Sequence, residues 1–313
     1  MNRLHTQSFA NGITVHASER DGSVNVRPMG RRSVLTGLAA ASLACRIGNV
    51  VAQDQSGSGQ GLLARLQQAK KVRVGVANQP PFSAVGPDGT LTGVAPSVSK
   101  AVMKRLGILE FEPSIGTYGE LIPGMLAGRW DFVTAALTVT KPRCEQVLFS
   151  DPVTLDARAI VSFKGELADP PTRIADLVAK RTVVGIIAGG ADLRLMLSVG
   201  VDQSNLKQFP QDSALMDGLI AKRVQVAFGS HAALVRISQL RKLDLAITYP
   251  IEDDRPTFTA CAFRKEDTDL YGAFQKELGA LKASGEFQVI VEQNGFEAPP
   301  ALVRATPVQA CAF

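Results

Sequence analysis

Short apolar segments alternate with amphipathic segments along most of this chain, and this alternation limits its fold more than any other feature. Lys71–Val76 has the pattern of a strand, and Pro96–Leu106 has the periodicity of a helix that stops at Gly107. Strands that alternate with helices predict an α/β fold with mainly parallel pairing. The same reasoning predicts strands at Trp130–Leu137, Thr182–Ile187, Val224–Phe228 and Leu245–Tyr249, and helices at Tyr118–Ala127, Ala191–Val199, Ser213–Lys222 and Asp267–Ala283.

One internal similarity bears on the architecture. Leu121–Asp131 aligns with Leu215–Gln225 at an offset of 94 residues, with identical residues at four of eleven positions. Chance similarity between two amphipathic helix–strand units is one explanation. The other is a pair of lobes built alike, with a cleft between them where a small ligand binds at the carboxyl ends of the strands.

Charge is concentrated at the N-terminus. Residues 1–52 hold six arginines and two acidic residues, whereas the other 261 residues carry 28 basic and 27 acidic side chains. A nearly neutral body gives no electrostatic case for nucleic-acid binding. His231 is the only histidine after residue 52, which argues against a histidine-rich metal site. We expect no metal and no cofactor.

The N-terminal segment has the features of an export signal. Arg31 and Arg32 precede an apolar run of about eleven residues, which is too short to span the roughly 30 Å of a bilayer core. Residues 1–52 are therefore predicted to be a twin-arginine signal, cleaved after Ala52. A basic N-terminus without this role is the alternative. Translation from Met29 would leave a compact signal, and Cys45 raises the question of lipidation.

Both ends of the mature chain are expected to lie outside the two main bodies of the fold. Residues 53–61 are rich in Gly, Ser and Gln, which predicts a flexible tether. Residues 301–313 are predicted to form a C-terminal tail. Cys144, Cys261 and Cys311 cannot all pair. We expect three free thiols, and the alternative is one disulfide between Cys144 and Cys261.

A hydroxyl-rich turn after a predicted strand carries the clearest chemistry. Thr138 and Thr140 precede Arg143, and the planar fork of an arginine matches both oxygens of a ligand carboxylate. No nucleophile, base or metal cluster accompanies this turn. The segment therefore indicates binding rather than catalysis.

Several motifs resemble those of family 3 bacterial extracellular solute-binding proteins, which feed ABC importers. They include Thr140–Arg143, Phe149–Pro152, Val76–Phe82 and Leu121–Gly124, and within the family the chain is most similar to the ectoine/hydroxyectoine-binding branch. The resemblance implies a type II periplasmic-binding-protein fold, with two lobes joined by a two-segment hinge. Lobe 1 would comprise residues 62–156 plus 254–300, and lobe 2 residues 157–253. The crossing segments would lie near residues 152–158 and 250–256.

The resemblance also implies ligand-binding residues. Arg143 matches the carboxylate-binding arginine, Phe82 and Tyr118 match aromatic walls, and the turn before the helix at 191–199 would favour an anion. Each position also has an ordinary structural interpretation, as a surface, core, strand-end or turn residue. The full set is Gln79, Phe82, Tyr118, Thr138, Thr140, Arg143, Gly190, Ala191 and Ser230.

Three of these positions depart from relatives. Amino-acid binders usually have an aspartate where this chain has Ser230. The ectoine branch has a glutamate where this chain has Gln79, and an aromatic residue where it has Thr138. A neutral amide cannot neutralise a ligand cation as a carboxylate does. The sequence therefore predicts a pocket that favours net-anionic or weakly cationic solutes over ectoine.

We expect a monomeric periplasmic receptor that delivers a small carboxylate-bearing solute, such as an ectoine-like compatible solute or an amino acid, to an ABC permease and its ATPase. No transmembrane helix is expected in the mature chain. The rival is an enzyme on the same fold, a cyclohexadienyl dehydratase-like lyase, which needs an acid or base in the cleft. Its nearest candidates, Glu120, Asp151 and Asp192, have ordinary interpretations as helix or turn residues. A sensory input module would need a further transmembrane helix downstream.

Overall fold

The computed structural model describes residues 61–312. The predicted export signal at residues 1–52, and residues 53–60 of the predicted tether, lie outside this range. The first described helix, α1 (Leu62–Ala69), begins where the folded body was expected to begin.

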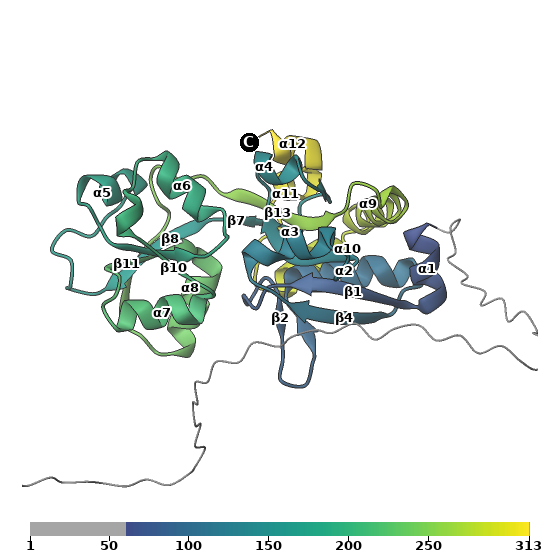
Figure 1. Cartoon of the computed structure of the whole chain (residues 1–313), viewed down its shortest axis with the longest axis horizontal. Coiled ribbons are helices and arrows are strands. Elements are labelled where there is room, and N and C mark those ends of the chain that lie inside the picture. The colour runs from purple at the N-terminus through teal and green to yellow at the C-terminus, as the bar shows by residue number, and fades with distance from the viewer. Residues whose placement is uncertain (1–60, 313) are drawn as a thin grey trace, which may run out of the picture. The chain divides into compact units, whose positions relative to one another are not determined.

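Two mixed sheets organise the described chain, each forming the centre of one lobe (Figure 1). The first sheet contains β1 (Lys71–Val76), β4 (Glu110–Ile115), β5 (Phe132–Thr138), β6 (Leu148–Phe149), β7 (Thr154–Asp156) and β13 (Thr257–Phe263). Its order is β4-β1-β5-β13-β6, with β7 also paired to β13. The second sheet contains β8 (Arg158–Phe163), β9 (Val184–Ile187), β10 (Leu206–Phe209), β11 (Val226–Ser230) and β12 (Leu245–Thr248), in the order β10-β9-β11-β8-β12. A small hairpin pairs β2 (Ala84–Val85) with β3 (Leu91–Thr92).

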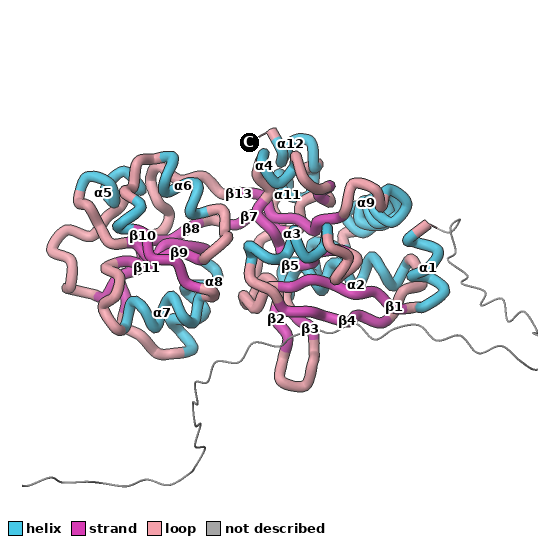
Figure 2. The backbone as a smooth tube through the Cα atoms, in the orientation of Figure 1, coloured by secondary structure: helices cyan, strands magenta, loops and turns pink. Residues whose placement is uncertain are grey.

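Helices cover both sheets (Figure 2). Those of the first lobe are α1, α2 (Val94–Arg105), α3 (Tyr118–Leu126), α4 (Lys141–Cys144), α9 (Thr268–Ala283), α10 (Glu286–Gln293), α11 (Pro300–Arg304) and α12 (Pro307–Cys311). Those of the second are α5 (Ile174–Ala179), α6 (Asp192–Ser198), α7 (Asp212–Ile220) and α8 (His231–Leu240), with a 3-10 turn at Gln203–Asn205. In Figure 1, α5 and α6 lie on one side of the second sheet, and α7 and α8 on the other.

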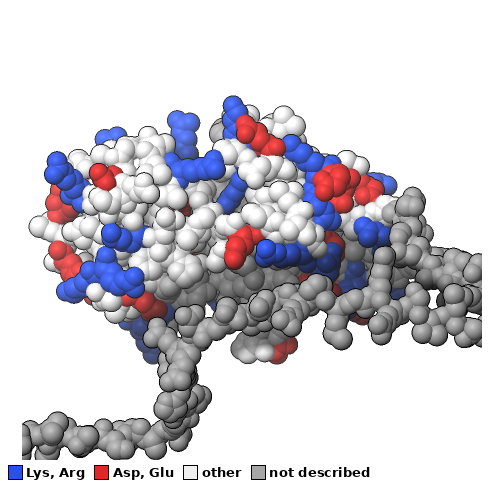
Figure 3. All heavy atoms as spheres, in the orientation of Figure 1, with Lys and Arg blue, Asp and Glu red and all other residues white. Residues whose placement is uncertain are grey.

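Apolar side chains from strands and helices make the cores. In the first lobe Phe132 stacks on Phe263 with ring centroids 5.2 Å apart, and Phe274 of α9 packs against both. In the second lobe Phe228 is fully buried among residues of β8, β9 and α6. Basic and acidic side chains are interspersed over the face drawn in Figure 3, in keeping with the nearly neutral body.

The prediction of mainly parallel pairing is wrong. β1 is parallel to β4 and β5, and β9 is parallel to β10 and β11. However, β13 runs antiparallel to β5, and β8 antiparallel to β11. β8 and β13 each follow an extended segment that crosses from the other lobe rather than a helix, so they enter their sheets in the opposite direction. Figure 1 shows β7 and β13 where the two lobes join.

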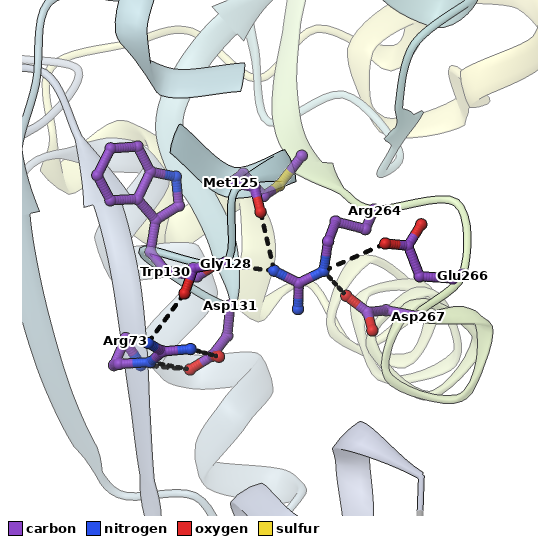
Figure 4. Close-up of polar contacts among 8 residues, drawn as sticks. All are labelled: Arg73, Met125, Gly128, Trp130, Asp131, Arg264, Glu266 and Asp267. Carbon is purple, nitrogen blue, oxygen red and sulfur yellow. Dashed lines mark hydrogen bonds and ion pairs between the residues drawn. The ribbon is translucent and has the colours of Figure 1, made fainter. Parts of the chain in front are cut away.

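The two similar segments found in the sequence form the same local structure. Helix α3 leads into β5, and helix α7 leads into β11. Asp131, just before β5, accepts a hydrogen bond from the Arg73 backbone N–H at 2.9 Å and pairs with its guanidinium at 2.7 Å (Figure 4). Gln225, just before β11, accepts a hydrogen bond from the Val183 N–H at 2.8 Å. Both units are therefore tied to a neighbouring parallel strand by one side chain.

The predicted C-terminal tail contains two short helices, α11 and α12, whose Leu302 and Ala310 are buried. The prediction about the cysteines is wrong. Cys144 pairs with Cys311 in a disulfide with Cα atoms 6.1 Å apart, so the chain does not carry three free thiols. The alternative pairing of Cys144 with Cys261 is also wrong, because Cys261 is free and buried in β13. The sequence could not reveal the pairing of Cys144 with Cys311, because it depends on how α12 packs back beside α4.

No helix among residues 61–312 is long and apolar enough to cross a membrane.

Candidate functional site

A cavity of about 40 Å³ lies between the lobes, with walls from both sheets. Of the predicted site residues, it is lined by Gln79, Phe82, Tyr118, Thr138, Arg143, Gly190, Ala191 and Ser230. Thr140 is not brought to this cavity. The structure adds Ala136, Asp156, Arg158, Ile187 and Gly229, which the sequence did not point to, and Asp192, which the sequence named only as a candidate acid of the rival enzyme.

Arg143 reaches from the first lobe toward the second. It belongs to the short helix α4, where its N–H donates to the Thr140 carbonyl at 3.0 Å. Its Nη1 donates to the Thr138 carbonyl at 2.8 Å, and its Nη2 donates to the Gly189 carbonyl of the second lobe at 3.2 Å. Carbonyl oxygens orient the guanidinium without cancelling its charge. Within residues 61–312 it forms no salt bridge, so its charge remains available to an anion.

A bulge in β5 shapes the wall beside Arg143. Thr134–Ala136 of β5 stand opposite the single residue Cys261 of β13. Ala136 has φ +49°, an uncommon conformation for a residue with a side chain. Bulges of this kind re-aim the end of a strand. Thr138 follows the bulge, is paired with Thr259 and lines the cavity, and its carbonyl oxygen accepts the hydrogen bond from Arg143.

The aromatic wall is held by polar contacts. The Tyr118 hydroxyl donates to Gln79 Oε1, and it lies 3.3 Å from the Ala135 carbonyl oxygen. Tyr118 is the first residue of α3, whose start is fixed by the Thr117–Glu120 capping box. Phe82 lines the cavity and also packs in the core, with its ring 4.9 Å from that of Phe296. Its binding and core interpretations are therefore compatible.

Asp156 is the most consequential residue that sequence reasoning missed. It ends β7, lines the cavity, and accepts a hydrogen bond from Ser230 Oγ at 2.8 Å. Burial raises the pKa of Asp156 to about 7, against the opposing effects of Ser230 and Arg158. A carboxylate at the predicted first crossing, near residues 152–158, was the available signal.

Arg158 forms ion pairs with two other carboxylates. It pairs with Asp192 at 2.7 Å and with Asp254 at 3.1 Å, so it cannot fully neutralise Asp156. Asp192 also opens α6, a helix of seven residues directly after Gly190 and Ala191. Because this carboxylate already lies at the helix start, the predicted anion preference there is not favoured.

Asp212 places another carboxylate next to the cavity. It opens α7, is 7% exposed, and has an Oδ1 without a hydrogen-bond partner in the described part of the chain. Burial raises the pKa of Asp212 to about 6, and a hydrogen bond with Gln79 opposes the shift. The two residues line an adjoining cavity of about 340 Å³. Gln79 therefore lies between Tyr118 of the first lobe and Asp212 of the second.

Comparison with known proteins decides the family. Residues 72–297 match the bacterial extracellular solute-binding proteins, family 3. The chain belongs to this family. The family 3 assignment agrees with the structure of EhuB in complex with hydroxyectoine, which is 33% identical, has a TM-score of 0.76, and covers 80% of this chain and 97% of EhuB. The predicted fold, a type II periplasmic-binding protein with two lobes and a two-segment hinge, is confirmed.

Two curated relatives of this family 3 protein differ in kind. A probable amino-acid ABC transporter periplasmic-binding protein, y4tE of Sinorhizobium fredii, is 26% identical over 72% of this chain and 77% of its own length. Membrane-bound lytic murein transglycosylase F of Photobacterium profundum is 25% identical over 74% of this chain but only 45% of its own length. The first has the name of a binding protein and the second that of an enzyme.

The acidic residues considered for an enzyme have structural partners in this family 3 chain. Glu120 accepts hydrogen bonds from both the N–H and the Oγ1 of Thr117 at 2.9 Å. Asp151 lies 3.5 Å from Lys282 Nζ, and Asp192 pairs with Arg158. No group of three potential metal ligands occurs within the described residues.

An outer cavity of about 870 Å³ adjoins the inner one at Arg143. Thr140 lines this outer cavity, together with Lys141, Arg194 and Arg255, and no acidic residue among residues 61–312 contributes to its wall. The inner cavity differs, because Asp156 and Asp192 contribute to it. The expectation of a site without a carboxylate, drawn from Gln79 and Ser230 alone, was therefore incomplete.

Proposed function

We propose that this family 3 protein is the periplasmic substrate-binding component of an ABC importer for a small polar solute that bears a carboxylate. An ectoine-like compatible solute, an amino acid and an amino-acid derivative are the candidates, in line with the names of EhuB and y4tE. A permease and its ATPase would be the partners, and the receptor would act as a monomer.

The single observation that carries this proposal is the placement of Arg143. Its guanidinium lies in a cavity between the lobes, is oriented by two carbonyl oxygens, and has no carboxylate partner within residues 61–312. A planar guanidinium in this setting matches a ligand carboxylate. Phe82 and Tyr118 would enclose the apolar part of the solute, and Gln79, Thr138 and Ser230 would contact its polar groups.

Entry of the solute requires the lobes to part. A water needs roughly 10–15 Å³ of such space, so 40 Å³ holds only a few waters and no organic solute. We place lobe 1 at residues 62–156 plus 254–300 and lobe 2 at residues 157–253. The crossing segments between them would then act as a hinge, as in other binding proteins that close around a ligand.

A ligand screen tests the proposal. Purified mature chain would be tested by thermal shift and then calorimetry against ectoine, hydroxyectoine and the common α-amino acids, with uncharged sugars as controls. We expect saturable binding of at least one carboxylate-bearing solute and no binding of sugars. Binding of a sugar in place of every carboxylate-bearing solute would overturn the assignment.

Export by the twin-arginine route is part of the same proposal. Replacing Arg31 and Arg32 by lysines should leave the precursor in the cytoplasm, whereas translation from Met29 should not impair export. The exported chain should begin near Gln53, so that Cys45 is removed with the signal, as read by mass spectrometry. Normal periplasmic yield of the lysine variant would contradict this route.

Asp156 is the observation that favours the enzyme alternative, because a cavity carboxyl with a pKa of about 7 suits acid–base catalysis. We infer that the chain binds without turnover, since Asp192, the other acidic residue among the lining residues, is paired with Arg158. Incubating the bound solute with stoichiometric protein and recording its NMR spectrum tests this point. Chemical conversion of the solute, abolished in Asp156→Asn, would establish the lyase instead.

A further inference from the structure

We propose that Asp156 binds the positive group of a zwitterionic solute, and that Ser230 positions the Asp156 carboxylate for this contact. This inference rests on the proposed function and adds the second pole of the site. It places the cation-binding residue on the strand that crosses between the lobes, rather than at the end of the second-lobe strand β11.

The backbone of Asp156 is fixed by the first sheet. Asp156 ends β7 and is paired with Thr257 of β13. Its carboxylate meets the second lobe, because Ser230 Oγ donates to Oδ1 at 2.8 Å. Ser230 caps α8, and its side chain also accepts a hydrogen bond from the Ala233 N–H at 3.4 Å. Two lobes therefore hold one carboxylate at the cavity wall.

The other carboxylates nearby either form ion pairs with Arg158 or face the adjoining cavity. Asp192 and Asp254 both pair with Arg158. Asp212 faces Gln79 in the adjoining cavity. Within the described chain, Ser230 makes the one hydrogen bond to the Asp156 carboxylate, and a hydroxyl carries no charge to balance it. A cationic group of a solute would supply that charge.

Arg143 and Asp156 line the same cavity from different elements, α4 and β7. The site therefore offers one cation and one anion to a single solute. A molecule with a carboxylate at one end and an ammonium or amidinium at the other fits both, which sets its orientation. α-Amino acids and ectoine belong to this class, whereas simple carboxylic acids would leave Asp156 without a counter-charge.

The charges around Asp156 give this contact a pH signature. Arg158 of β8 lowers its pKa, whereas Asp192 of α6, Asp212 of α7 and burial raise it. A solute cation placed against Asp156 would lower the pKa, so binding should release a proton between about pH 5 and pH 7. Affinity for a zwitterion should then rise with pH over this interval.

Substitution of Asp156 by Asn is the direct test. The probes are ectoine, L-glutamine and L-serine, with N-acetyl-L-glutamine and N-acetyl-L-serine as counterparts that keep the carboxylate and carry no cationic group. We expect Asp156→Asn to weaken zwitterion binding about tenfold or more, as for the loss of a charge-assisted hydrogen bond. Binding of the N-acetyl acids should not weaken. The exposed carboxylate variant Asp244→Asn is the control for net charge.

A double variant that moves the carboxylate to a neighbouring position separates loss of the charge from general damage to the fold. Asp156→Asn combined with Ser230→Asp moves the carboxylate across the same hydrogen bond. Recovery of zwitterion affinity in the double variant supports the proposal. Proton release by the unmodified protein, measured by calorimetry at pH 6 in two buffers of different ionisation enthalpy, remains informative even if a variant fails to fold.

The outcomes separate this inference from the proposed function. If Asp156→Asn binds zwitterions as tightly as the unmodified protein, or if binding releases no proton, Asp156 does not hold the cation, while the receptor function stands. Binding of the N-acetyl acids alone leads to the same conclusion. If no carboxylate-bearing probe binds the unmodified protein, the inference and the proposed function both fall.

Discussion

The two helix–strand units of this molecule share a framework and differ in chemistry. Helices α3 and α7 start 94 residues apart and end 94 residues apart, and strands β5 and β11 also start at that offset. Each helix is followed by a left-handed residue, Gly128 with φ +72° or Lys222 with φ +56°. The geometry of the turn is therefore kept whether or not glycine occupies it.

The side chain before each strand shows what this framework requires. The Asp131 N–H donates to the Arg73 carbonyl at 2.9 Å, and the Gln225 N–H donates to the Val183 carbonyl at 2.9 Å. Both side chains accept the return bond, but only Asp131 adds an ion pair. An acceptor of suitable length is thus enough, and charge is an addition specific to the first unit. Figure 4 also shows Arg264, which donates to the carbonyls of Met125 and Trp130 in this unit.

The units diverge most where they meet the cavity. The first places Tyr118 at its helix start and leads through Thr138 to Arg143. The second begins with Asp212 and ends at Ser230, which holds Asp156. The repeated framework thus delivers a cation from one lobe and carboxylates from the other lobe and the crossing strand. The cavity-lining residues of the two units thus lie mainly at the ends of their strands and helices.

The largest expected effect is on solute affinity and concerns Arg143, the cationic residue of the proposed site. Arg143→Ala should weaken binding of a carboxylate-bearing solute by about 2–5 kcal/mol, as for truncation of one partner of a buried charge pair. Arg143→Lys should recover only part, because the planar fork is lost. Calorimetry is the measurement, and Arg129→Ala, at an exposed arginine of the same unit, is the control. Equal affinity in Arg143→Ala and the control would remove Arg143 from the site.

Asp156, the anionic residue of the proposed site, should make the stability of the unliganded protein depend on pH. The folded pKa of Asp156, about 7, lies above its ordinary value near 4, so the folded state binds the proton more tightly than the unfolded state. Its contribution to stability is therefore complete below about pH 4 and declines as the pH rises to about 7. The decline is on the order of 1.4 kcal/mol for each pKa unit.

Denaturant titrations of the unmodified protein and Asp156→Asn from pH 4 to pH 8 would measure this decline. Taking the stability difference between the two proteins removes the contributions of the other carboxylates to the pH dependence. Several of these have lowered pKa values and act in the opposite direction. We expect the difference to fall across the interval and then level off. A constant difference would show that Asp156 titrates normally.

Asp131 and Gln225, the side chains that tie each unit to its neighbouring strand, allow a matched comparison of stability. Asp131 is 4% exposed and accepts charge-assisted bonds, so Asp131→Ala should cost about 1.5–3 kcal/mol of unfolding free energy. Gln225 is exposed and neutral, and water can replace it, so Gln225→Ala should cost about 1 kcal/mol or less. Denaturant unfolding measures both. Equal losses of unfolding free energy would mean that the charge of Asp131 adds nothing to the stability of the first unit.

A smaller effect should appear where the lobes touch. A Cβ at Gly189, with φ +68°, would lie 2.4 Å from the Gly119 nitrogen, whereas a Cβ at Gly119 would lie 3.5 Å from the Gly189 Cα. Gly189→Ala should therefore hinder closure and weaken solute binding by about 1–3 kcal/mol, as for overpacking of a close contact. Gly119→Ala should bind normally.

Calorimetry together with small-angle scattering distinguishes these two variants. With solute present, Gly189→Ala should keep a larger radius of gyration than Gly119→Ala. Identical affinities and radii would show that this contact does not form in the liganded protein.

Periodicity in the sequence was enough to predict most of the framework. Lys71–Val76 was predicted as a strand and is β1, and the helix predicted at Tyr118–Ala127 is α3 to within one residue. These elements are predictable because their apolar spacing is a local property. The direction of β8 and β13 was not, because it depends on the path of the chain between lobes.

The site was predictable in its residues and only partly in its charge. Eight of the nine expected positions line the inner cavity, but whether they bind solute stays a prediction. Asp156 was missed because its importance depends on distant partners. Arg158 would neutralise it if Asp192 and Asp254 did not pair with that arginine. Such competition among long-range ion pairs has no periodic signal in a sequence.

A crystal structure of the protein with its tightest-binding solute from the screen would examine both poles of the site at once. We expect a solute between the closed lobes, with its carboxylate oxygens about 3 Å from the Arg143 guanidinium and its cationic nitrogen about 3 Å from Asp156. Density for the solute only in the outer cavity lined by Lys141 and Arg255, with Arg143 and Asp156 untouched, would show that neither pole binds the solute.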